Sequence, residues 1–247
     1  MRARVATEYI LASPKVDRSY RIAVVADLHN RPYEDILPLC AAADLVLIPG
    51  DLAHRYPHQA ARGLAFLRAA ADLAPTYYTY GNHEDLCDHV YMRRAADTGA
   101  VLLNNTWRAH AGLAIGGLYL YDTPRLLHWH DKRDIGDRQA AAAAHLLNDL
   151  ERAAGFRLLL CHKPNHFFTW VQPHAIDLTI SGHAHGGQIR LWGRGLYAPH
   201  QGLLPAWTHG LYADGRLLVS SGAANTAGLL PRLGNPCEVA VVRLERS

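Results

Sequence analysis

Short apolar runs alternate with Ala- and Leu-rich stretches in the first part of the chain, and this alternation constrains the fold more than any other feature. The runs at 21–26, 44–48 and 76–80 are short and rich in β-branched or aromatic residues, which is typical of buried strands. The stretches at 33–43 and 57–73, which lie between these runs, favour helices. Strands that alternate with helices in this way predict an α/β fold.

The rest of the sequence continues with elements of both kinds and shows no internal repeat, low-complexity tract or linker. We therefore expect residues 1–247 to form a single domain. The further expected elements are an edge strand over 3–16, helices over 86–97 and 137–153, short strands within 100–121, a loop over 122–135, strands over 156–161 and 176–180, hairpins over 189–221 and a last strand over 238–244.

Polar side chains that can bind metal ions follow the predicted strands at the points where the strands end. The motifs are Asp27-x-His29, Gly50-Asp51, Gly81-Asn82-His83-Glu84, His162 and Gly182-His183-x-His185. Sites in α/β sheets form at the carboxyl ends of strands. Each motif alone is also compatible with a common turn, loop or helix cap, but five such coincidences in this order favour one shared metal site.

The histidine pair after the strand at 176–180 carries the strongest single signal. Side chains of an extended segment alternate between its faces, so His183 and His185 can point the same way. Glycines on both sides let the backbone turn sharply and let a ligand approach closely. Neighbouring imidazoles indicate metal ligation. For this stretch alone, a polar turn that happens to hold two histidines remains an alternative.

Charge and cysteine content exclude several other classes of protein. The formal net charge is +3 with no block of like charge, which argues against a dedicated nucleic-acid binder. The four cysteines are isolated and form no C-x-x-C pair, so they indicate reduced thiols rather than a zinc ribbon or a thioredoxin motif. Neither a signal-peptide core nor an apolar run of transmembrane length is present. We therefore expect a cytoplasmic protein with no transmembrane segment.

The order and spacing of the five motifs resemble the calcineurin-like metallophosphoesterase superfamily. The resemblance covers the chain from Asp27 to His185. It implies a four-layer α/β/β/α sandwich with two mixed β-sheets and a dinuclear metal site at the carboxyl ends of the strands.

A second resemblance extends beyond these motifs. The stretch 182–190 is similar to a bacterial phosphodiesterase-like subgroup with a G-H-x-H-G-G-Q motif, and so is the stretch 220–238. That subgroup includes membrane-associated phosphoesterases, many of which begin with a membrane span. Two departures are Ala184, where Thr is usual, and the sequence Leu52-Ala53-His54-Arg55, where an acidic residue often follows Gly-Asp.

The resemblance implies a set of seven metal ligands. The first metal would be held by Asp27, His29 and His185, the second by Asn82, His162 and His183, and both by Asp51. A carboxylate can bridge two cations, neutral imidazoles suit transition metals, and an Asn side chain offers a neutral oxygen. This donor set favours two divalent or mixed-valence ions of Mn, Fe or Zn over Ca, without choosing among the three.

The function implied by the resemblance is dinuclear-metal-dependent hydrolysis of phosphate esters, with phosphodiester or pyrophosphate bonds favoured. A hydroxide that bridges the metals would attack phosphorus. His83 would bind no metal and would instead contact a phosphate oxygen or protonate the leaving group. The alternatives are a phosphomonoesterase acting on phosphoprotein or small metabolites, a catalytically silent scaffold of the same fold, and a nuclease, against which the modest charge weighs.

The residues expected around the metals have weaker signals. The carboxylates of Asp27, Asp51 and Glu84 are candidates to orient the histidines, with Glu84 the weakest. Lys163 faces either phosphate or solvent. Histidines 54, 58, 128 and 130 lie in loops that could border the site, although surface positions are the more common interpretation.

Apolar residues in the long loops suggest a substrate class. The residues are Trp129, Trp192 and Trp207 with the leucines at 126, 127, 203 and 204. Ordinary packing explains such residues most often. The functional alternative is a groove for a lipid-linked or aromatic leaving group, with contact between the protein and the membrane periphery.

Overall fold

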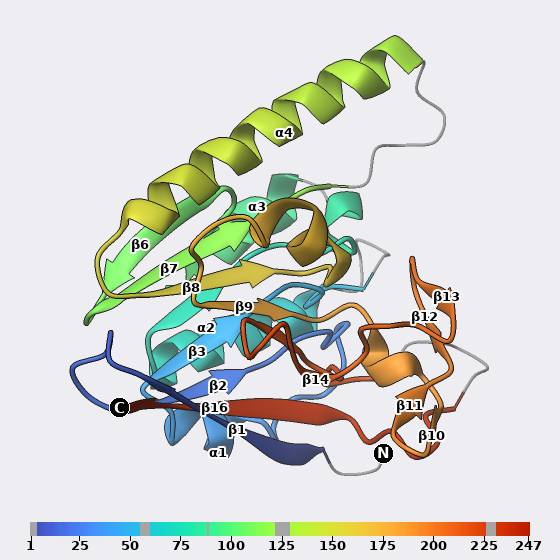
Figure 1. Ribbon diagram of the computed structural model, residues 1–247. Helices are drawn as coiled ribbons and strands as arrows, with labels where there is room; N and C mark the ends of the chain where they lie inside the picture. Colours follow the sequence, from blue (N-terminus) through green and yellow to red (C-terminus); the bar gives the residue numbers. More distant parts are fainter. Residues whose placement is uncertain (1–3, 55–59, 88, 122–128, 226–230) are drawn as a thin grey trace.

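Two six-stranded mixed sheets form the centre of the molecule (Figure 1). The computed structural model describes residues 4–54, 60–87, 89–121, 129–225 and 231–247. The first sheet has the order β1 (Val5–Ser13), β16 (Glu238–Arg246), β2 (Tyr20–Val24), β3 (Leu45–Ile48), β4 (Thr76–Tyr78) and β5 (Val101–Leu102). The second has the order β14 (Gly210–Tyr212), β15 (Leu217–Val219), β9 (Leu178–Ser181), β8 (Phe156–Cys161), β7 (Leu113–Leu118) and β6 (Thr106–His110).

Each sheet contains a parallel block whose strands end on the same side. In the first sheet β2, β3, β4 and β5 are parallel, while β16 runs antiparallel to β2 and parallel to β1. In the second sheet β15, β9, β8 and β7 are parallel, and the edge strands β14 and β6 are antiparallel to their neighbours. The carboxyl ends of β2, β3, β4, β8 and β9 are therefore available to build one site.

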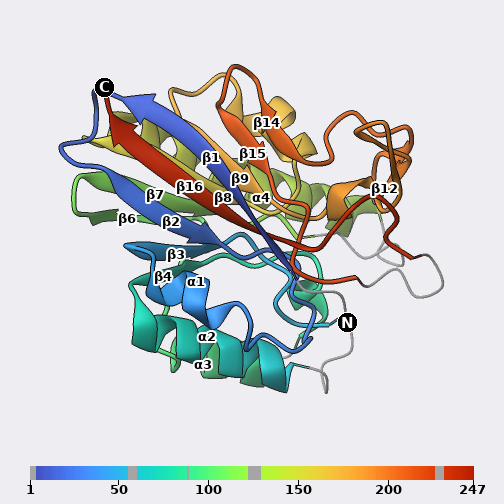
Figure 2. The ribbon, with the colours of Figure 1, turned by 90° about the horizontal axis from the view of Figure 1, so that it is seen from below.

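Helices cover the outer face of each sheet (Figure 2). The helices α1 (Leu37–Ala41), α2 (Ala61–Leu73) and α3 (His89–Ala96) lie on the first sheet, and α4 (Trp129–Arg152) lies on the second. The resulting order of layers is helix, sheet, sheet, helix. The four-layer α/β/β/α fold expected from the resemblance is confirmed.

The apolar periodicity of the strands explains this layering. Successive side chains of β2 point to opposite faces, so Ile22 and Val24 pack between the two sheets while Ala23 packs under the helices. Strand β3 behaves in the same way, with Leu45 and Leu47 facing the second sheet. Strands buried on both faces carry continuous apolar runs, which is why these segments could be recognised in the sequence.

Several expected boundaries differ from the structure. The loop expected over 122–135 is wrong from Trp129 onward, because α4 begins there, whereas 122–128 lie outside the described residues. The side chains that anchor α4 in the core are Ala143, Leu146, Leu147 and Leu150, all in its later part. The polar stretch before them shows no apolar periodicity that could indicate a helix.

Other differences are small. The helix expected over 57–73 begins at Ala61, because Ala60 is described and lies just before the helix as its N-cap, and 57–59 lie outside the described residues. The helix expected over 33–43 shortens to α1. The helix expected over 86–97 is divided into a 3₁₀ turn, η2 (Glu84–Leu86), and α3. A short π-helical turn, η3 (Phe167–Val171), follows β8 and was not expected.

Two small hairpins extend beyond the second sheet (Figure 1). They pair β10 (Arg190–Leu191) with β11 (Arg194–Gly195), and β12 (Tyr197–Ala198) with β13 (Gly202–Leu203). Both follow the 3₁₀ turn η4 (His185–Gly187), so they border the end of β9. The hairpins expected in this part of the sequence are confirmed.

Two further observations concern the cysteines and the helices. Cys40, Cys87, Cys161 and Cys237 are all free thiols. Among the described residues, no helix combines the length and the apolar character needed to cross a bilayer.

Candidate metal centre

All seven residues expected to ligate metal lie together where the strands of the two sheets end. Six of them are buried and Asn82 is half-buried. They come from five separate loops, which follow β2, β3, β4, β8 and β9. Residues far apart in the sequence thus form one cluster, as the order of the motifs predicted.

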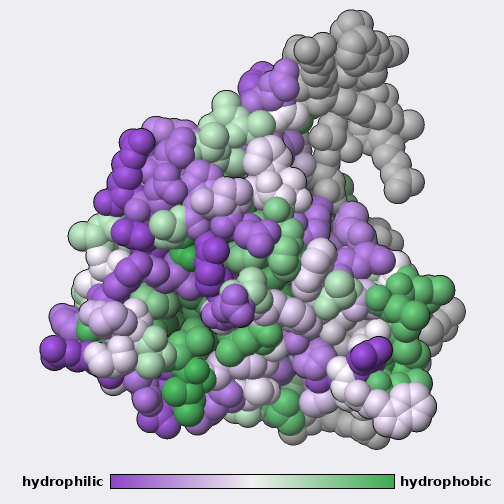
Figure 3. Space-filling view, in the orientation of Figure 1, coloured by the Kyte–Doolittle hydropathy of each residue, from purple (hydrophilic) through white to green (hydrophobic). Residues whose placement is uncertain are grey.

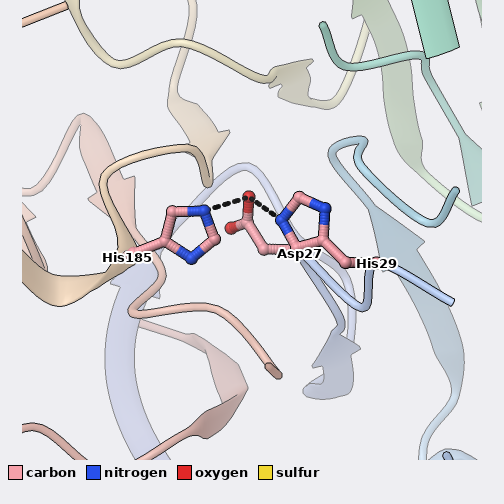
Figure 4. A group of neighbouring side chains, drawn as sticks. All are labelled: Asp27, His29 and His185. Carbon is pink, nitrogen blue, oxygen red and sulfur yellow. Dashed lines mark ion pairs between the residues drawn. The ribbon is translucent and has the colours of Figure 1, made fainter. Parts of the chain in front are cut away.

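The first group contains Asp27, His29 and His185, whose candidate ligand atoms lie within 4.8 Å of one another (Figure 4). Asp27 Oδ1 is 3.8 Å from His29 Nε2 and 3.9 Å from His185 Nε2. These separations are too long for hydrogen bonds. One carboxylate and two imidazole nitrogens that converge without bonding one another suit a cation between them.

The second group contains Asp51, His162 and His183. His162 Nε2 lies 3.2 Å from Asp51 Oδ2, 3.1 Å from His183 Nδ1 and 3.1 Å from Asn82 Oδ1. The other ring nitrogen of His162, Nδ1, lies 2.9 Å from the carbonyl oxygen of Pro49 and donates its hydrogen to it. This bond leaves the Nε2 lone pair of His162 directed at the group, which is the usual arrangement of a metal-binding histidine.

Asp51 connects the two groups. Its Oδ2 is 3.8 Å from His29 Nε2 in the first group and 3.2 Å from His162 Nε2 in the second. Its Oδ1 accepts a hydrogen bond from the backbone N–H of His83 at 2.9 Å. A carboxylate in this position can contact two cations at once.

His83 lies at the edge of the cluster. Its Nδ1 is 3.1 Å from His29 Nδ1, and its Nε2 is 3.8 Å from Asp51 Oδ2. His29, Asp51 and His83 form a third group of neighbouring ligand atoms. The residue is only 6% exposed, so it faces the same interior as the expected ligands.

The donor set fits transition-metal ions. The Nε2 atom of His29 is buried and has no hydrogen-bond partner among the described residues, and it is directed at the carboxylates of Asp27 and Asp51. A buried nitrogen without a partner costs stability unless something else satisfies it. Imidazole, carboxylate and amide donors in one cluster match Mn, Fe or Zn.

The electrostatics of the cluster favour added positive charge. Burial raises the pKa of Asp27 to about 7, although the His162 imidazole opposes this rise. Burial also acts to raise the pKa of Asp51, but His162 and His83 outweigh it and hold that pKa well below its ordinary value. Burial acts to lower the pKa of His162, yet Asp51 outweighs it and raises that pKa to about 9. Buried carboxylates are stabilised by cations nearby, which metal ions would supply.

Glu84 holds two of the loops together. Its carboxylate accepts hydrogen bonds from the backbone N–H groups of Asp51 at 2.9 Å, Gly81 at 2.7 Å and Ala53 at 2.8 Å. Burial and the nearby Asp51 carboxylate raise the pKa of Glu84 to about 7. Glu84 therefore fixes the backbone of the loops that follow β3 and β4, rather than a histidine ring.

The same two loops approach so closely that only glycine fits between them. A Cβ atom on Gly81 would lie 2.2 Å from Asp51 Oδ1, and one on Gly50 would lie 2.6 Å from the backbone nitrogen of Gly81. Gly50 also has φ of +104°, which residues with a side chain rarely adopt. These contacts explain why Gly precedes both Asp51 and Asn82.

Five of the seven expected ligands share an uncommon backbone conformation. Left-handed φ values between 48° and 68° occur at Asp27, His29, Asp51, His183 and His185. Non-glycine residues adopt this region infrequently, and strained backbone concentrates at functional sites. The three loops that carry these five ligands, after β2, β3 and β9, are thus shaped to turn the side chains inward at some cost to local stability.

The C-terminal stretch holds the histidine-pair loop from outside. Asn235 donates to the carbonyl oxygens of His185 at 2.7 Å and Gln188 at 3.1 Å, and Arg190 donates to Asn235 Oδ1 at 2.6 Å. Arg232 Nη2 lies 3.5 Å from His185 Nδ1. The two stretches at 182–190 and 220–238, from which the subgroup resemblance was inferred, thus pack against each other.

A small pocket adjoins the second group of ligands. It is lined by Tyr80, Gly81, Asn82, Leu118, Leu120, His162, Lys163 and His166. Lys163 is 5% exposed, so it faces neither bulk solvent nor the exterior of the fold. A cation and apolar side chains therefore lie together beside Asn82.

The remaining residues singled out from the sequence lie in different parts of the structure. The His54 ring lies near the cluster, with its centroid 6.4 Å from that of His29 and 5.7 Å from that of His83. Trp207 does not line a groove, because it stacks on Phe168 with centroids 4.1 Å apart. Outside the described residues or side chains lie His58, Leu126, Leu127, His128, Trp129 and His130.

The apolar surface lies on the hairpins instead. Trp192 is 97% exposed, Leu203 81% and Leu204 75%. The packing explanation is therefore correct for Trp207 and wrong for Trp192 and the two leucines. Sequence reasoning missed His200, which contacts His183, because a single loop histidine outside any motif gives no signal.

Comparison with known proteins agrees with this geometry. A family model described as calcineurin-like phosphoesterase matches residues 20–187. Two relatives, both named uncharacterized metallophosphoesterase, come from Helicobacter pylori. The one from strain ATCC 700392 / 26695 is 26% identical over 189 residues, covering 71% of this chain and 47% of the relative. The one from strain J99 / ATCC 700824 is 27% identical over 257 residues, covering 93% and 61%. The chain thus spans about half to three-fifths of the length of these relatives.

Similarity to solved structures is limited. The sulfate thiohydrolase SoxB from Thermus thermophilus, in complex with glycerol, has a TM-score of 0.46 at 12% identity, with 91% of this chain and 56% of that one covered. Another crystal structure has a TM-score of 0.48 at 14% identity and covers 67% and 84%.

Proposed function

The chain belongs to the calcineurin-like phosphoesterase family, and from this premise we propose that it hydrolyses phosphate esters with the help of two metal ions. The observation that carries the proposal is the convergence of two groups of ligand atoms on Asp51. Asp27, His29 and His185 would hold one ion, Asn82, His162 and His183 the other, and Asp51 both. Mn, Fe and Zn are the candidate metals.

The protein residues prepare the site for this chemistry. Two bound ions supply Lewis-acid chemistry that polarises phosphoryl oxygens and lowers the pKa of an attacking water. The hydrogen bond from His162 Nδ1 to the carbonyl oxygen of Pro49 fixes the orientation of the His162 ring. The Glu84 carboxylate fixes the loops that carry Asp51 and Asn82. Positioning before the substrate arrives reduces the entropy cost of reaching the transition state.

His83 is the proposed proton donor. Its backbone is held by Asp51, and its imidazole lies beside His29 at the edge of the cluster. An imidazole that binds no metal can contact a phosphate oxygen or protonate the leaving oxygen. Donation matters most when the leaving group is a poorly stabilised alkoxide.

The pocket beside Asn82 supports a phosphodiester or pyrophosphate substrate. The pocket has a volume of about 10 Å³, room for roughly one water molecule, so the chemistry of its lining and not its size supports the proposal. The buried Lys163 offers positive charge there, and Leu118 and Leu120 offer apolar contact.

The hairpin surface supports a lipid-linked substrate and contact with the membrane periphery. Apolar side chains gather over the β10–β13 hairpins (Figure 3), where Trp192, Leu203 and Leu204 are exposed. Trp residues favour membrane interfaces, and the neighbouring exposed Arg194 suits anionic head groups. The free cysteines suit the cytoplasmic face of such a membrane.

We also propose that residues 1–247 act as one domain. Both sheets contribute loops to the cluster, and the apolar layer between them is shared. Neither sheet could be removed without taking ligands with it.

A substrate panel tests the proposed reaction. The purified protein is loaded with Mn²⁺, Fe²⁺ or Zn²⁺ and assayed on an alkyl phosphodiester, a nucleotide-linked lipid pyrophosphate, a phosphomonoester and a phosphopeptide. We expect the diester or the pyrophosphate to be hydrolysed fastest. Preference for the monoester or phosphopeptide would assign the phosphomonoesterase alternative. A purified protein that binds no metal ion and turns over none of these substrates would assign the silent scaffold.

A further inference from the structure

His183 uses both of its ring nitrogens. Its Nδ1 lies 3.1 Å from His162 Nε2, inside the second group of candidate ligands. Its Nε2 lies 2.8 Å from Nδ1 of His200, a residue that the motifs do not include. The centroids of the His183 and His200 rings are 4.9 Å apart, and the angle between the ring planes is 31°. A histidine from the hairpins therefore touches the cluster from outside.

The proton positions follow from the chemistry of imidazole. A neutral imidazole carries one N–H, and its other nitrogen has the lone pair. If Nδ1 of His183 offers its lone pair to a metal, the hydrogen must be on Nε2, from which it is donated to His200 Nδ1. A metal-binding histidine usually donates its second nitrogen in this way, which fixes its tautomer and ring orientation.

His200 is held in place by its own surroundings. It lies in the turn between β12 and β13 with φ of +58°. The next residue, Gln201, donates from Nε2 to the carbonyl oxygen of Trp207 at 2.8 Å and accepts from the Trp207 N–H at 3.0 Å. Trp207 stacks on Phe168, which belongs to η3, the turn that follows His162. The hairpin is thereby braced against the segment that carries a neighbouring ligand.

We propose that His200 is a positioning residue that accepts the Nε2 hydrogen of His183 and directs the His183 Nδ1 lone pair at the second metal ion. This inference rests on the proposed metal centre. The family model ends at residue 187, so nothing in the family pattern assigns His200 a role. The hairpins would then tune metal binding as well as forming an exposed surface.

Metal titration of matched variants tests the proposal. His200→Phe keeps a ring but removes the acceptor, whereas His200→Asn keeps an acceptor oxygen near the position of Nδ1. His145→Phe, at an exposed position of α4 outside the cluster, is the control. The affinities of the full-length protein for Mn²⁺ alone are measured by calorimetry, with circular dichroism to verify folding.

We expect the wild type and His145→Phe to bind two ions. His200→Phe should lose roughly 10–100-fold in affinity for one ion and leave the other unchanged. His200→Asn should recover most of that loss. Unchanged binding in His200→Phe, equal weakening of both ions, or no recovery in His200→Asn would overturn the positioning role. A wild type that binds no Mn²⁺ would overturn the metal centre itself, and with it this inference.

A spectroscopic measurement covers the case in which His200→Phe does not fold. Long-range ¹⁵N–¹H correlation spectra of the Zn²⁺-loaded wild type report which nitrogen of each histidine ring carries the hydrogen. We expect His183 to be protonated on Nε2. Protonation on Nδ1 would contradict the proposal.

Discussion

The ligand loops and the hairpin edge border the same site but are built in opposite ways. The ligand loops (27–29, 49–51, 81–84, 162–163 and 182–185) are mostly buried, and hydrogen bonds and close glycine contacts cross from one to another. The hairpin edge (190–204) consists of strands of two residues with large apolar side chains exposed at its tips.

This difference indicates that the two regions have different roles. Cross-bonded, buried loops keep charged groups in a fixed geometry, which metal chemistry requires. Short exposed hairpins contribute little to the core, so their side chains can suit a substrate or surface without disturbing the fold. His200 is the exception, because it reaches from the hairpin edge to a residue of the ligand loops.

Loss of Asp51 should produce the largest effect. Asp51→Asn removes one negative charge from the only residue that we assign to both ions. We expect metal affinity to fall by more than the roughly 10–100-fold seen for partners outside the ligand shell, and activity to fall with it. Metal content by mass spectrometry and turnover are measured together. Full metal content with near-normal turnover would show that Asp51 does not bridge.

Loss of His83 should separate chemistry from metal binding within the ligand loops. His83→Asn should keep both metals, and on alkyl phosphodiesters it should lose on the order of 10²–10⁴-fold in rate, the usual contribution of a general acid. Nitrophenyl esters, whose leaving group needs little protonation, should lose far less.

Two other results would change the role of His83. An equal loss on both substrates, with metals retained, would replace proton donation with phosphate contact. Loss of metal would make His83 a ligand, as its position beside His29 and Asp51 permits.

Substitution of Glu84 tests whether hydrogen bonds between the ligand loops hold them in place. Glu84→Gln replaces one acceptor oxygen with an amide donor that faces backbone N–H groups. We expect the free energy of unfolding to fall by about 1–3 kcal/mol, the cost of leaving a buried donor unsatisfied. Chemical denaturation measures this free energy of unfolding. The control is Glu245→Gln, which removes a charge from an exposed ion pair. If the free energy of unfolding fell no more than in the control, Glu84 would not be what holds the two loops together.

The hairpin edge should give the smallest effect. Trp192→Ser combined with Leu203→Ser should weaken binding to vesicles of phosphatidylglycerol and phosphatidylethanolamine about tenfold, or about 1.4 kcal/mol, because side chains that enter only the head-group region gain less than the about 1.5–3 kcal/mol of full burial. Hydrolysis of a soluble diester should not change. Ile10→Ser, at a position 58% exposed on β1, is the control. Equal vesicle binding by all three proteins would argue against membrane contact.

The sequence predicted the two regions unequally, for physical reasons. Buried parallel strands require continuous apolar runs, and their carboxyl ends lie at one edge of the sheet. The residues that follow the runs at 21–26, 44–48 and 76–80 could therefore be grouped from the sequence pattern alone. Long-range packing leaves no such pattern. Glu84 bonds backbone atoms 31 to 33 residues away, and Arg232 approaches a histidine 47 residues earlier.

For the hairpin edge, the sequence predicted the presence of hairpins but not which of their side chains are exposed. Its glycines indicated turns, but exposure depends on how the hairpins pack. Trp192 and Trp207 lie 15 residues apart in similar loops, yet one is exposed and the other is stacked on Phe168. The contact of His200 with His183 depends on the same packing, and no local pattern contains it.

Anomalous X-ray diffraction from crystals grown with Mn²⁺ tests the central claim most directly. We expect two anomalous peaks. One should lie among Asp27, His29 and His185, the other among Asn82, His162 and His183, with Asp51 in contact with both. A single peak held by His29, Asp51 and His83, or no peak in the cluster, would contradict the dinuclear assignment.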